Sequence, residues 1–329
     1  MQNYNHQNNL WLIGDIGGTA TRLGLANLEK KTVKQIKVFN NQEYLKLDQI
    51  IKNYLQKINQ NPIYACLAVA GPINKEIIKL TNHSWTFTIE EYKSLFGWTR
   101  LFVINDFHAL ALSLPDLKQE QYLPIGDFDK NRTPLHGNLA VIGPGTGLGI
   151  AGLIPYKNHW IAIAGEGGHI AFAPYNNKEI ALLNILREHH GSYISYEKLL
   201  SGYGLESLYL ALSKLHHYSN PSSLTAQEIT HNGLNQTCKI CHETIYLFCA
   251  ILGSIAGDVA LMFNASQGVY IGGGIIEKLL PILDKSDFRQ RFNDKGIHSN
   301  LMKNIPTYVI TASYPALFGS LRYIQDNIS

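Results

Sequence analysis

Two segments of the chain, about 130 residues apart, share one design: an apolar strand, a glycine-rich turn and a second apolar strand. The first is LWLIGDIGGTATRLGLANL, residues 10–28, and the second is NLAVIGPGTGLGIAGLIP, residues 138–155. A strand, a glycine turn and a second strand in which apolar residues alternate are together typical of a β-hairpin. The repetition therefore predicts two similarly built halves whose glycine-rich turns face each other.

The segments after the first hairpin predict an α/β unit. VKQIKVFN extends the hairpin as a third strand, and apolar residues recur at three- and four-residue steps over residues 43–58, which predicts an amphipathic helix. The short apolar runs IYACLAVAGPI and LFVINDF are typical of buried parallel strands. We expect the order β-β-β-α-β-α-β-α for the first third of the chain.

The rest of the chain repeats this alternation. We expect a surface connection at residues 126–137, a strand in WIAIAGEGGHIAFAP, helical segments over residues 178–212 and a long apolar helix over residues 237–264. GVYIGGGII and TYVITA are predicted strands, and a C-terminal helix is predicted from Pro315. We expect that helix to pack back on the N-terminal part.

Size and composition favour a cytoplasmic protein of two domains. The 329 residues are 45% hydrophobic and 16% charged, enough for two linked cores. The 28 basic and 25 acidic residues are spread along the chain, so we expect no nucleic-acid partner. The first nine residues lack the order of a signal peptide, and no apolar run approaches the roughly 20 residues of a membrane span. The four cysteines are expected to be reduced.

The first glycine turn suits an anion. Glycines let backbone N–H groups approach a phosphate closely, and the acidic residue beside them could hold hydrated Mg²⁺. A plain hairpin turn with an acidic residue is an equally good interpretation from this segment alone. The residues concerned are Gly14, Asp15, Gly17, Gly18 and Thr19.

The second turn, GPGTGLG, has four glycines in seven positions, at a cost in backbone entropy that simple packing hardly explains. It also fits the G-x-G-x-x-G pattern of dinucleotide-binding folds, but that pattern needs a helix directly after it, whereas a strand-like segment with Pro155 follows. No G-x-x-x-x-G-K-[ST] loop and no protein-kinase motif set occurs. A third cluster, Gly272 to Gly274, follows a late strand and is a weak signal by itself.

Asn105 and Asp106 close the apolar run LFVI. A carboxylate at the carboxyl end of a buried strand lies where α/β proteins bind ligands, and it could accept a proton from an attacking hydroxyl. The competing interpretation is that Asp106 is only the N-cap of the next helix, and residue type alone favours the cap.

The segment GEGGH, residues 165–169, places a carboxylate and an imidazole on a glycine frame. Such a pair suits an uncharged polyol, because Glu166 can accept from neighbouring hydroxyls and His169 can both donate and accept. Glu197 could be a third sugar ligand, although an exposed helical glutamate is the default interpretation. Cys238, Cys241 and His242 raise a zinc hypothesis, but no second ligand pair is present, so buried thiols are favoured.

Seven motifs occur in the order and approximate spacing of one known family: IGDIGGT, TNHSW, INDF, GPGTGLG, AGEGGH, EKLLSG and IGGGI. In this respect the chain resembles the bacterial glucokinases of the actin, Hsp70 and sugar-kinase superfamily, from about Leu10 to Leu321. The resemblance implies ATP-dependent phosphorylation of D-glucose at its 6-hydroxyl. It also implies a homodimer and an α/β, two-domain actin-like ATPase (ribonuclease H-like) fold with an active-site cleft between the domains.

The resemblance implies roles for individual residues, and it reverses the preference at Asp106 and Glu197. Residues 1–116 plus 313–329 would form the small domain and residues 117–312 the large one. Asp106 would be the catalytic base, and the glucose ligands would be Asn105, Asp106, Glu166, His169 and Glu197. ATP would be held by Gly14, Asp15, Ile16, Gly17, Gly18, Thr19, Gly143, Gly145, Thr146, Gly147 and Gly273, with Mg²⁺ near Asp15 through water.

The sequence departs from the family pattern at two positions. Pro144 stands where alanine is familiar, and Ala171 stands where an aspartate is common. The related repressor and kinase group called ROK has a cysteine-rich zinc motif beside its segment that corresponds to AGEGGH. In this chain the neighbouring AFAPYNNKEI has no cysteine, so the zinc-free branch is preferred.

The rival hypotheses for the function are a kinase for another hexose or an amino sugar, a sugar-sensing regulator, and a filament-forming or chaperone-like ATPase. A strand that begins near Leu10 leaves no room before it for a helix-turn-helix.

Overall fold

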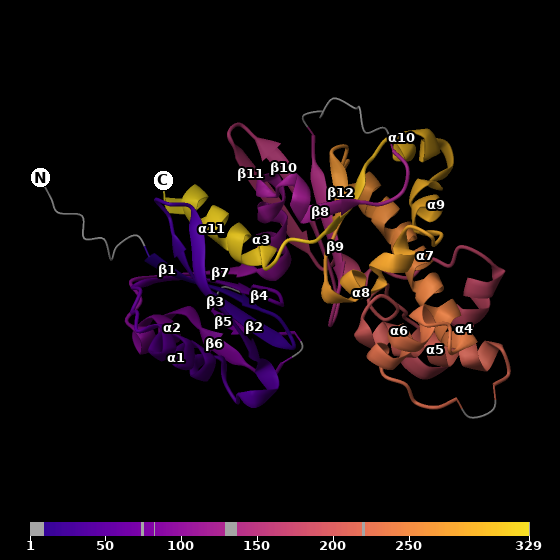
Figure 1. The fold of residues 1–329 in the computed structure, drawn as a ribbon, viewed down its shortest axis with the longest axis horizontal. Helices are drawn as coiled ribbons and strands as arrows, with labels where there is room; N and C mark the ends of the chain where they lie inside the picture. Colours follow the sequence, from indigo (N-terminus) through magenta and orange to yellow (C-terminus); the bar gives the residue numbers. More distant parts are fainter. Residues whose placement is uncertain (1–9, 74–75, 82, 129–136, 219–220, 329) are drawn as a thin grey trace, which may run out of the picture. The chain divides into compact units, whose positions relative to one another are not determined.

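The computed structural model describes residues 10–328 except 74–75, 82, 129–136 and 219–220 (Figure 1). The chain divides into two compact units. Unit 1 comprises residues 1–117, 156–164 and 312–329, and unit 2 comprises residues 118–155 and 165–311. The chain has two large mixed β-sheets, the first within unit 1 and the second mainly within unit 2, described in turn below.

The first sheet begins with a hairpin and continues with parallel strands. Its order is β3 (Thr32–Asn40), β2 (Ala20–Asn27), β1 (Leu10–Ile16), β4 (Tyr64–Val69) and β7 (Arg100–Asn105). The strand β2 is antiparallel to both of its neighbours, β1 and β3, and β1, β4 and β7 are parallel. The parallel strands therefore all end at the same edge of the sheet, where β1 leads into the first glycine turn and β7 ends at Asn105.

Helices cover both faces of this sheet, because β1 is apolar on both sides. Leu12 packs in a core with α1 (Leu47–Ile58) and α2 (Ile89–Phe96). Ile13, on the opposite face, packs with α3 (Asp106–Ser113) and α11 (Pro315–Ile328). The remaining elements of the unit are η2 (Asn41–Glu43), β5 (Ile77–Lys79), β6 (Thr86–Thr88) and η3 (Leu114–Asp116).

The C-terminal helix α11 is part of the core of unit 1. Leu317 and Leu321 are buried beside Trp11 and Ile13 of β1. A Cβ atom at Gly319 would lie 1.6 Å from the carbonyl oxygen of Ala109, so α11 and α3 are in backbone contact at this point. Residues 315–328 thus complete the core of the unit that begins with β1.

The second sheet repeats the plan of the first. Its order is β11 (His159–Gly165), β10 (Leu148–Tyr156), β9 (Leu139–Pro144), β12 (Gly268–Ile271), β13 (Thr307–Ile310) and β8 (Tyr122–Pro124). The strands β9 and β10 are antiparallel, and β9, β12 and β13 are parallel. The correspondence of β9 with β1, and of β10 with β2, confirms the two similarly built halves that the repeated hairpin predicts.

Unit 2 is rich in helix, and its core surrounds α7 (Lys239–Met262). Among the helices of the described residues, α7 alone has the length and apolar composition of a membrane span, but 72% of the window concerned is buried inside the protein. Burial of this kind is typical of a core helix. The other elements are α4 (Asn177–His190), α5 (Gly202–Leu215), α6 (Ala226–Leu234), α8 (Gly274–Leu283), α9 (Phe288–Asn293), α10 (Ser299–Lys303), η4 (Gln119–Gln121), η5 (Gly167–His169) and η6 (Gly296–His298).

The predicted elements named here are confirmed with two corrections. The helix predicted at residues 43–58 begins at Leu47, because the backbone at Lys46 is extended. The strand predicted in residues 160–174 ends at Gly165, where the glycine run turns into η5. The helical segments predicted over residues 178–212 are confirmed as α4 and α5, and α4 ends before Gly191, which has a positive φ of 82°. Most of the predicted connection at residues 126–137 lies outside the described residues.

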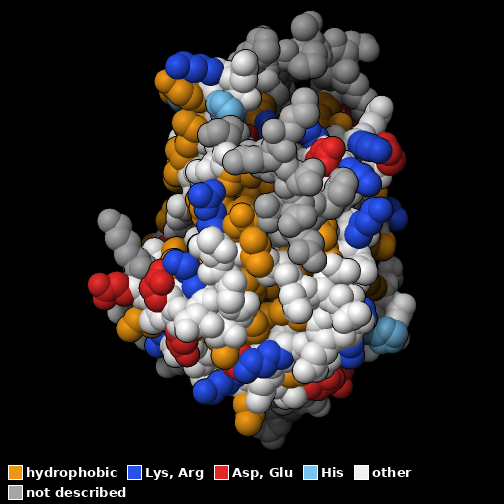
Figure 2. All heavy atoms as spheres, turned by 90° about the vertical axis from the view of Figure 1, so that its left-hand side faces the viewer, with side chains coloured by type: hydrophobic (Ala, Val, Ile, Leu, Met, Phe, Trp, Pro, Cys, Tyr) orange, Lys and Arg blue, Asp and Glu red, His pale blue; other side chains and the backbone are white. Residues whose placement is uncertain are grey.

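Basic and acidic side chains are interspersed on the face shown in Figure 2, with hydrophobic side chains exposed between them. This pattern matches the even spread of Lys and Arg along the sequence. On that face the basic side chains form several small groups.

Candidate active site

The first glycine turn joins β1 to β2 and has an exposed tip. The N–H of Gly17 donates to the carbonyl oxygen of Ala20 at 3.1 Å, which closes the turn, and Thr19 is exposed. Gly14 and Ile16, also predicted to bind ATP, lie within β1 and are buried. A Cβ at Gly14 would come within 2.9 Å of the Ile16 and Leu67 side chains, so a larger residue there would force these two side chains to shift. The groups that can reach a ligand are those of residues 17–19.

Asp15, at the end of β1, is paired with Arg22 on β2. One Arg22 guanidinium nitrogen, Nη1, lies 3.0 Å from Asp15 Oδ2, and the Asp15 side chain is 15% exposed. Burial raises the pKa of Asp15 above its ordinary value, and the charge and hydrogen bond of Arg22 oppose that rise. Since ATP phosphates and water supply most ligands of a bound Mg²⁺, one carboxylate beside the turn fits an ion held through water. Within the described residues, no group of three or more His, Cys, Asp or Glu side chains could hold a metal alone.

Asn105 caps the helix that follows β7. Its Oδ1 accepts hydrogen bonds from the N–H groups of Phe107 (2.9 Å) and His108 (3.1 Å), and its Nδ2 donates to the carbonyl oxygen of Gly71 (3.2 Å). The interpretation of Asp106 as the N-cap is therefore wrong, because Asn105 has that role. Asp106 is the first residue of α3, where its Oδ1 accepts from the N–H of Phe107 at 3.0 Å.

The second glycine turn joins β9 to β10 and is held by backbone groups. The N–H of Gly145 donates to the carbonyl oxygen of Gly147 at 2.8 Å, and the carbonyl oxygen of Gly145 accepts from the N–H of Gly202 at 3.0 Å. Gly202 is the first residue of α5, so the amino end of that helix abuts the turn. Thr146 is exposed at the tip, as Thr19 is in the first turn.

The third glycine cluster lies beside the second turn. Gly273 has a φ of +97°, and a Cβ there would lie 2.3 Å from the carbonyl oxygen of Pro144. Only glycine fits both the dihedral angle and the contact. Because α8 begins at Gly274, the amino ends of α5 and α8 both lie close to this turn. Helix amino ends present N–H donors and a partial positive charge, which together suit a phosphate.

The three residues predicted to bind sugar through unit 2 converge. The Nε2 atom of His169 lies 3.9 Å from Glu166 Oε2 and 3.7 Å from Glu197 Oε1. The hydroxyl of Tyr193 donates to the carbonyl oxygen of His169 at 2.6 Å, which holds the η5 turn in place. We refer to Glu166, His169 and Glu197 as the carboxylate–imidazole cluster.

Glu197 links this cluster to the second turn. Its Oε2 accepts a hydrogen bond of 2.9 Å from the N–H of Leu148, the first residue of β10, while its Oε1 faces His169. Its own N–H donates to the carbonyl oxygen of Gly168 at 2.9 Å. Glu197 is not the exposed helical glutamate of the default interpretation, since its side chain is 28% exposed and lies in a turn before α5.

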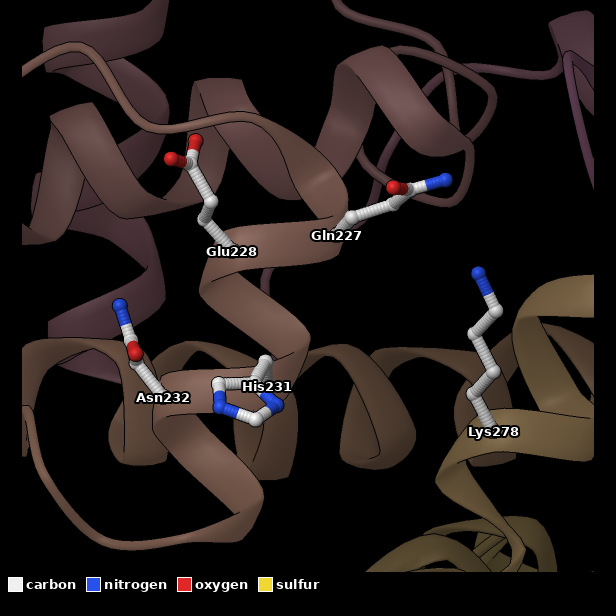
Figure 3. Close-up of a pocket in the computed structure, with 5 residues that line it drawn as sticks. All are labelled: Gln227, Glu228, His231, Asn232 and Lys278. Carbon is white, nitrogen blue, oxygen red and sulfur yellow. The ribbon is translucent and has the colours of Figure 1, made fainter.

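An open hollow of about 420 Å³ lies elsewhere in unit 2 (Figure 3). Lys278 of α8 lies across it from α6. Its lining contains none of the residues predicted from the sequence: Gln227, Glu228, His231, Asn232 and Lys278.

The cysteines proposed for zinc have structural partners. The Sγ of Cys238 accepts from the N–H of Cys241 at 3.2 Å, which caps α7, and Cys241 is buried. Burial raises the pKa of the Cys241 thiol to about 12. His242 Nδ1 lies 3.0 Å from the carbonyl oxygen of Gly233. These contacts favour the interpretation as buried thiols.

Three residues of the site were missed by sequence reasoning. Asn41 is buried and bonds to the first turn, Arg22 pairs with Asp15, and Gly202 bonds to the second turn. Arg22 alternates with buried residues next to the first turn and could have been found from that pattern. Asn41 and Gly202 are separated from their partners by 24 and 57 residues in the sequence, and no local sequence pattern predicts these contacts.

Two sheets of matching order, each with a glycine turn between its first two core strands, define the actin-like ATPase fold. A family model described as Glucokinase matches residues 12–327. The glucokinase of Photorhabdus laumondii is 39% identical over 318 residues, which cover 97% of this chain and 98% of the relative. The chain belongs to the glucokinase family.

Solved structures agree with this assignment. A glucokinase from an Antarctic psychrotroph has a TM-score of 0.82 at 34% identity, with 97% of this chain and 99% of the other covered. A glucokinase from Balamuthia mandrillaris, crystallised with glucose, has the same TM-score at 23% identity, with 97% and 94% covered. At that identity the second likeness shows the fold alone.

Proposed function

We propose that this protein is an ATP:D-glucose 6-phosphotransferase in which Asp106 is the general base. The observation that carries the proposal is the match to the glucokinase family from residue 12 to residue 327. Asp106 directly follows the carboxyl end of a parallel strand, and Asn105, not Asp106, is the N-cap of α3. A carboxylate so placed is suited to accept a proton from a substrate hydroxyl.

In the proposed reaction the 6-hydroxyl oxygen of glucose attacks the γ-phosphorus of ATP. The bond from the γ-phosphorus to the bridging oxygen breaks, ADP leaves with that electron pair, and the hydroxyl proton passes to the Asp106 carboxylate. Positioning and charge stabilisation supply most of the acceleration in phosphoryl transfer. The protein forms no covalent bond to the substrate.

The two glycine turns are proposed to bind the phosphates of ATP. Residues 17–19 would supply the first set of N–H groups, and Gly145, Thr146 and Gly147 the second, with Gly273 allowing close approach at Pro144. Bound Mg²⁺ would offset charge on the phosphoryl oxygens, and Asp15 would hold it through water. Gly14, Ile16 and Gly143 would contribute by shaping the strands beside the turns.

The carboxylate–imidazole cluster is proposed to bind glucose. Carboxylates accept from sugar hydroxyls, and the imidazole of His169 can donate and accept, so the cluster suits an uncharged polyol. Asn105 is proposed to join it, although its amide already makes three hydrogen bonds to the protein backbone. We also propose the domains 1–116 plus 313–329 and 117–312, a homodimer and a cytoplasmic location, as the family resemblance implies.

The proposal is tested by ADP release with ATP and Mg²⁺ alone, and then with glucose, mannose, fructose or N-acetylglucosamine. We expect fast release with glucose and a low background without sugar. A clear preference for another sugar would establish the rival kinase, and equal release without sugar would favour a filament-forming or chaperone-like ATPase.

A further inference from the structure

Asn41 lies directly after β3 and beneath the first glycine turn. It is 1% exposed, and it makes four hydrogen bonds to residues in or next to the turn. Its Nδ2 donates to the carbonyl oxygens of Gly17 (2.8 Å) and Gly18 (3.2 Å). Its Oδ1 accepts from the hydroxyl of Thr21 (2.8 Å), and its backbone N–H donates to the carbonyl oxygen of Thr19 (3.0 Å).

These bonds determine which way the peptide groups of the turn face. In a trans peptide the N–H points opposite to the C=O of the same plane. Because Asn41 holds the carbonyl groups of Gly17 and Gly18, the N–H groups of Gly18 and Thr19 point away from it. Asn41 is buried and Thr19 is exposed, so these N–H groups are turned to the open side of the turn. Successive N–H groups with one orientation form an anion-binding surface.

The second turn needs no such side chain, because the N–H of Gly202 holds the carbonyl oxygen of Gly145. In the first turn the side-chain amide of Asn41 supplies the corresponding donor. We propose that Asn41 is a positioning residue that holds the first turn in its phosphate-binding conformation. This inference rests on the proposed function, because it takes the phosphates of ATP as the ligand of the turn.

The decisive variant is Asn41→Asp, which keeps the size of the side chain and the acceptor for Thr21 but cannot donate to Gly17 and Gly18. We expect KM for ATP to rise by about tenfold to a hundredfold, as for the loss of two buried hydrogen bonds, with kcat changed less. The dissociation constant of glucose, measured by calorimetry without nucleotide, should not change. Asn40→Asp is the matched control, because Asn40 is adjacent and exposed and makes the same change of charge.

The outcomes separate the inference from the proposed function. If the wild-type protein shows no sugar-dependent ADP release, the proposed function fails. If it shows that release and Asn41→Asp has a wild-type KM for ATP, the positioning role fails. Equal increases for ATP and glucose with a lower melting temperature would show a merely structural residue and would also overturn it.

If Asn41→Asp does not fold, Thr21→Val decides the question. Valine has nearly the shape of threonine and removes only the hydroxyl that orients the Asn41 amide. We expect a rise of about threefold to tenfold in KM for ATP, with unchanged glucose affinity. An unchanged KM for ATP in this variant would overturn the inference.

Discussion

The two glycine turns have the same design and different supports. The first is held by hydrogen bonds from the buried side chain of Asn41, whereas the second is held by the backbone of Gly202 and by the Glu197 carboxylate. The difference shows that one hairpin design can be fixed either by a single buried amide or by the amino end of a helix. The difference also bears on function. Glu197, which helps to hold the second turn, belongs to the carboxylate–imidazole cluster, whereas Asn41, which holds the first turn, does not.

The two units also differ in the functional groups that they contribute. Unit 1 contains Asp106, the proposed base, and unit 2 contains the carboxylate–imidazole cluster, which is suited to recognition. Loss of Asp106 should therefore lower kcat, whereas loss of a residue of the carboxylate–imidazole cluster should raise KM for glucose. Three experiments test this contrast.

The largest effect is expected for Asp106→Ala. Loss of a general base should lower kcat by about 10²- to 10⁴-fold, while calorimetry still detects glucose binding. Asp48→Ala is a matched control, since Asp48 is also an acidic residue in the first turn of a helix in unit 1. Near-normal turnover of the Asp106 variant would remove this residue from the chemistry.

A smaller effect on both substrates is expected for Glu197→Ala. The variant loses the acceptor for the Leu148 N–H and the carboxylate beside His169, so KM should rise by about tenfold to a hundredfold for glucose and also for ATP. Glu206→Ala is the control, because Glu206 accepts from a backbone N–H, that of Ala226, elsewhere in unit 2. A rise confined to glucose would show that the second turn does not depend on Glu197.

The smallest effect is expected for Arg22→Leu. Arg22 opposes the rise in the pKa of Asp15 that burial causes, so its removal should raise that pKa further. If ionised Asp15 is needed, the acidic limb of kcat/KM for ATP should move to higher pH, with little change in the rate on the alkaline side. The pH profile of Arg100→Leu, which removes an exposed arginine of the same unit, provides the reference. An unmoved acidic limb would mean that the charge of Asp15 does not limit ATP use.

Local patterns predicted most of the fold. The repeated hairpin, the apolar runs that form β4 and β7, and the long apolar helix α7 were all visible in the sequence pattern, and their order indicated the α/β fold. Helix starts were less predictable. The helix was predicted to begin at residue 43, which is the last residue of η2, whereas α1 begins at Leu47. The spacing of the apolar residues within α1 does not depend on the conformation of the residues before it, so it could not locate this start.

The candidate site was predicted in its residue types more than in its connections. The position of Asp106 at a strand end was predicted, but which of two neighbouring polar residues would cap α3 could not be. Glu197 was chosen by resemblance alone, because its contact with Leu148 spans 49 residues. Hydrogen bonds between distant segments depend on the packed fold, so a single sequence does not contain them as a pattern.

The backbone contact between Gly319 and Ala109 has a consequence for biosynthesis. During translation, the face of the first sheet that bears Trp11 and Ile13 lacks the cover of α11 until residues 315–328 have been made, although α3 is already available to it. At a synthesis rate of about 5–20 residues per second, that apolar face waits for roughly ten seconds or more after its strands have emerged. The core on this side of β1 is therefore completed only after about 200 further residues have been synthesised beyond β7.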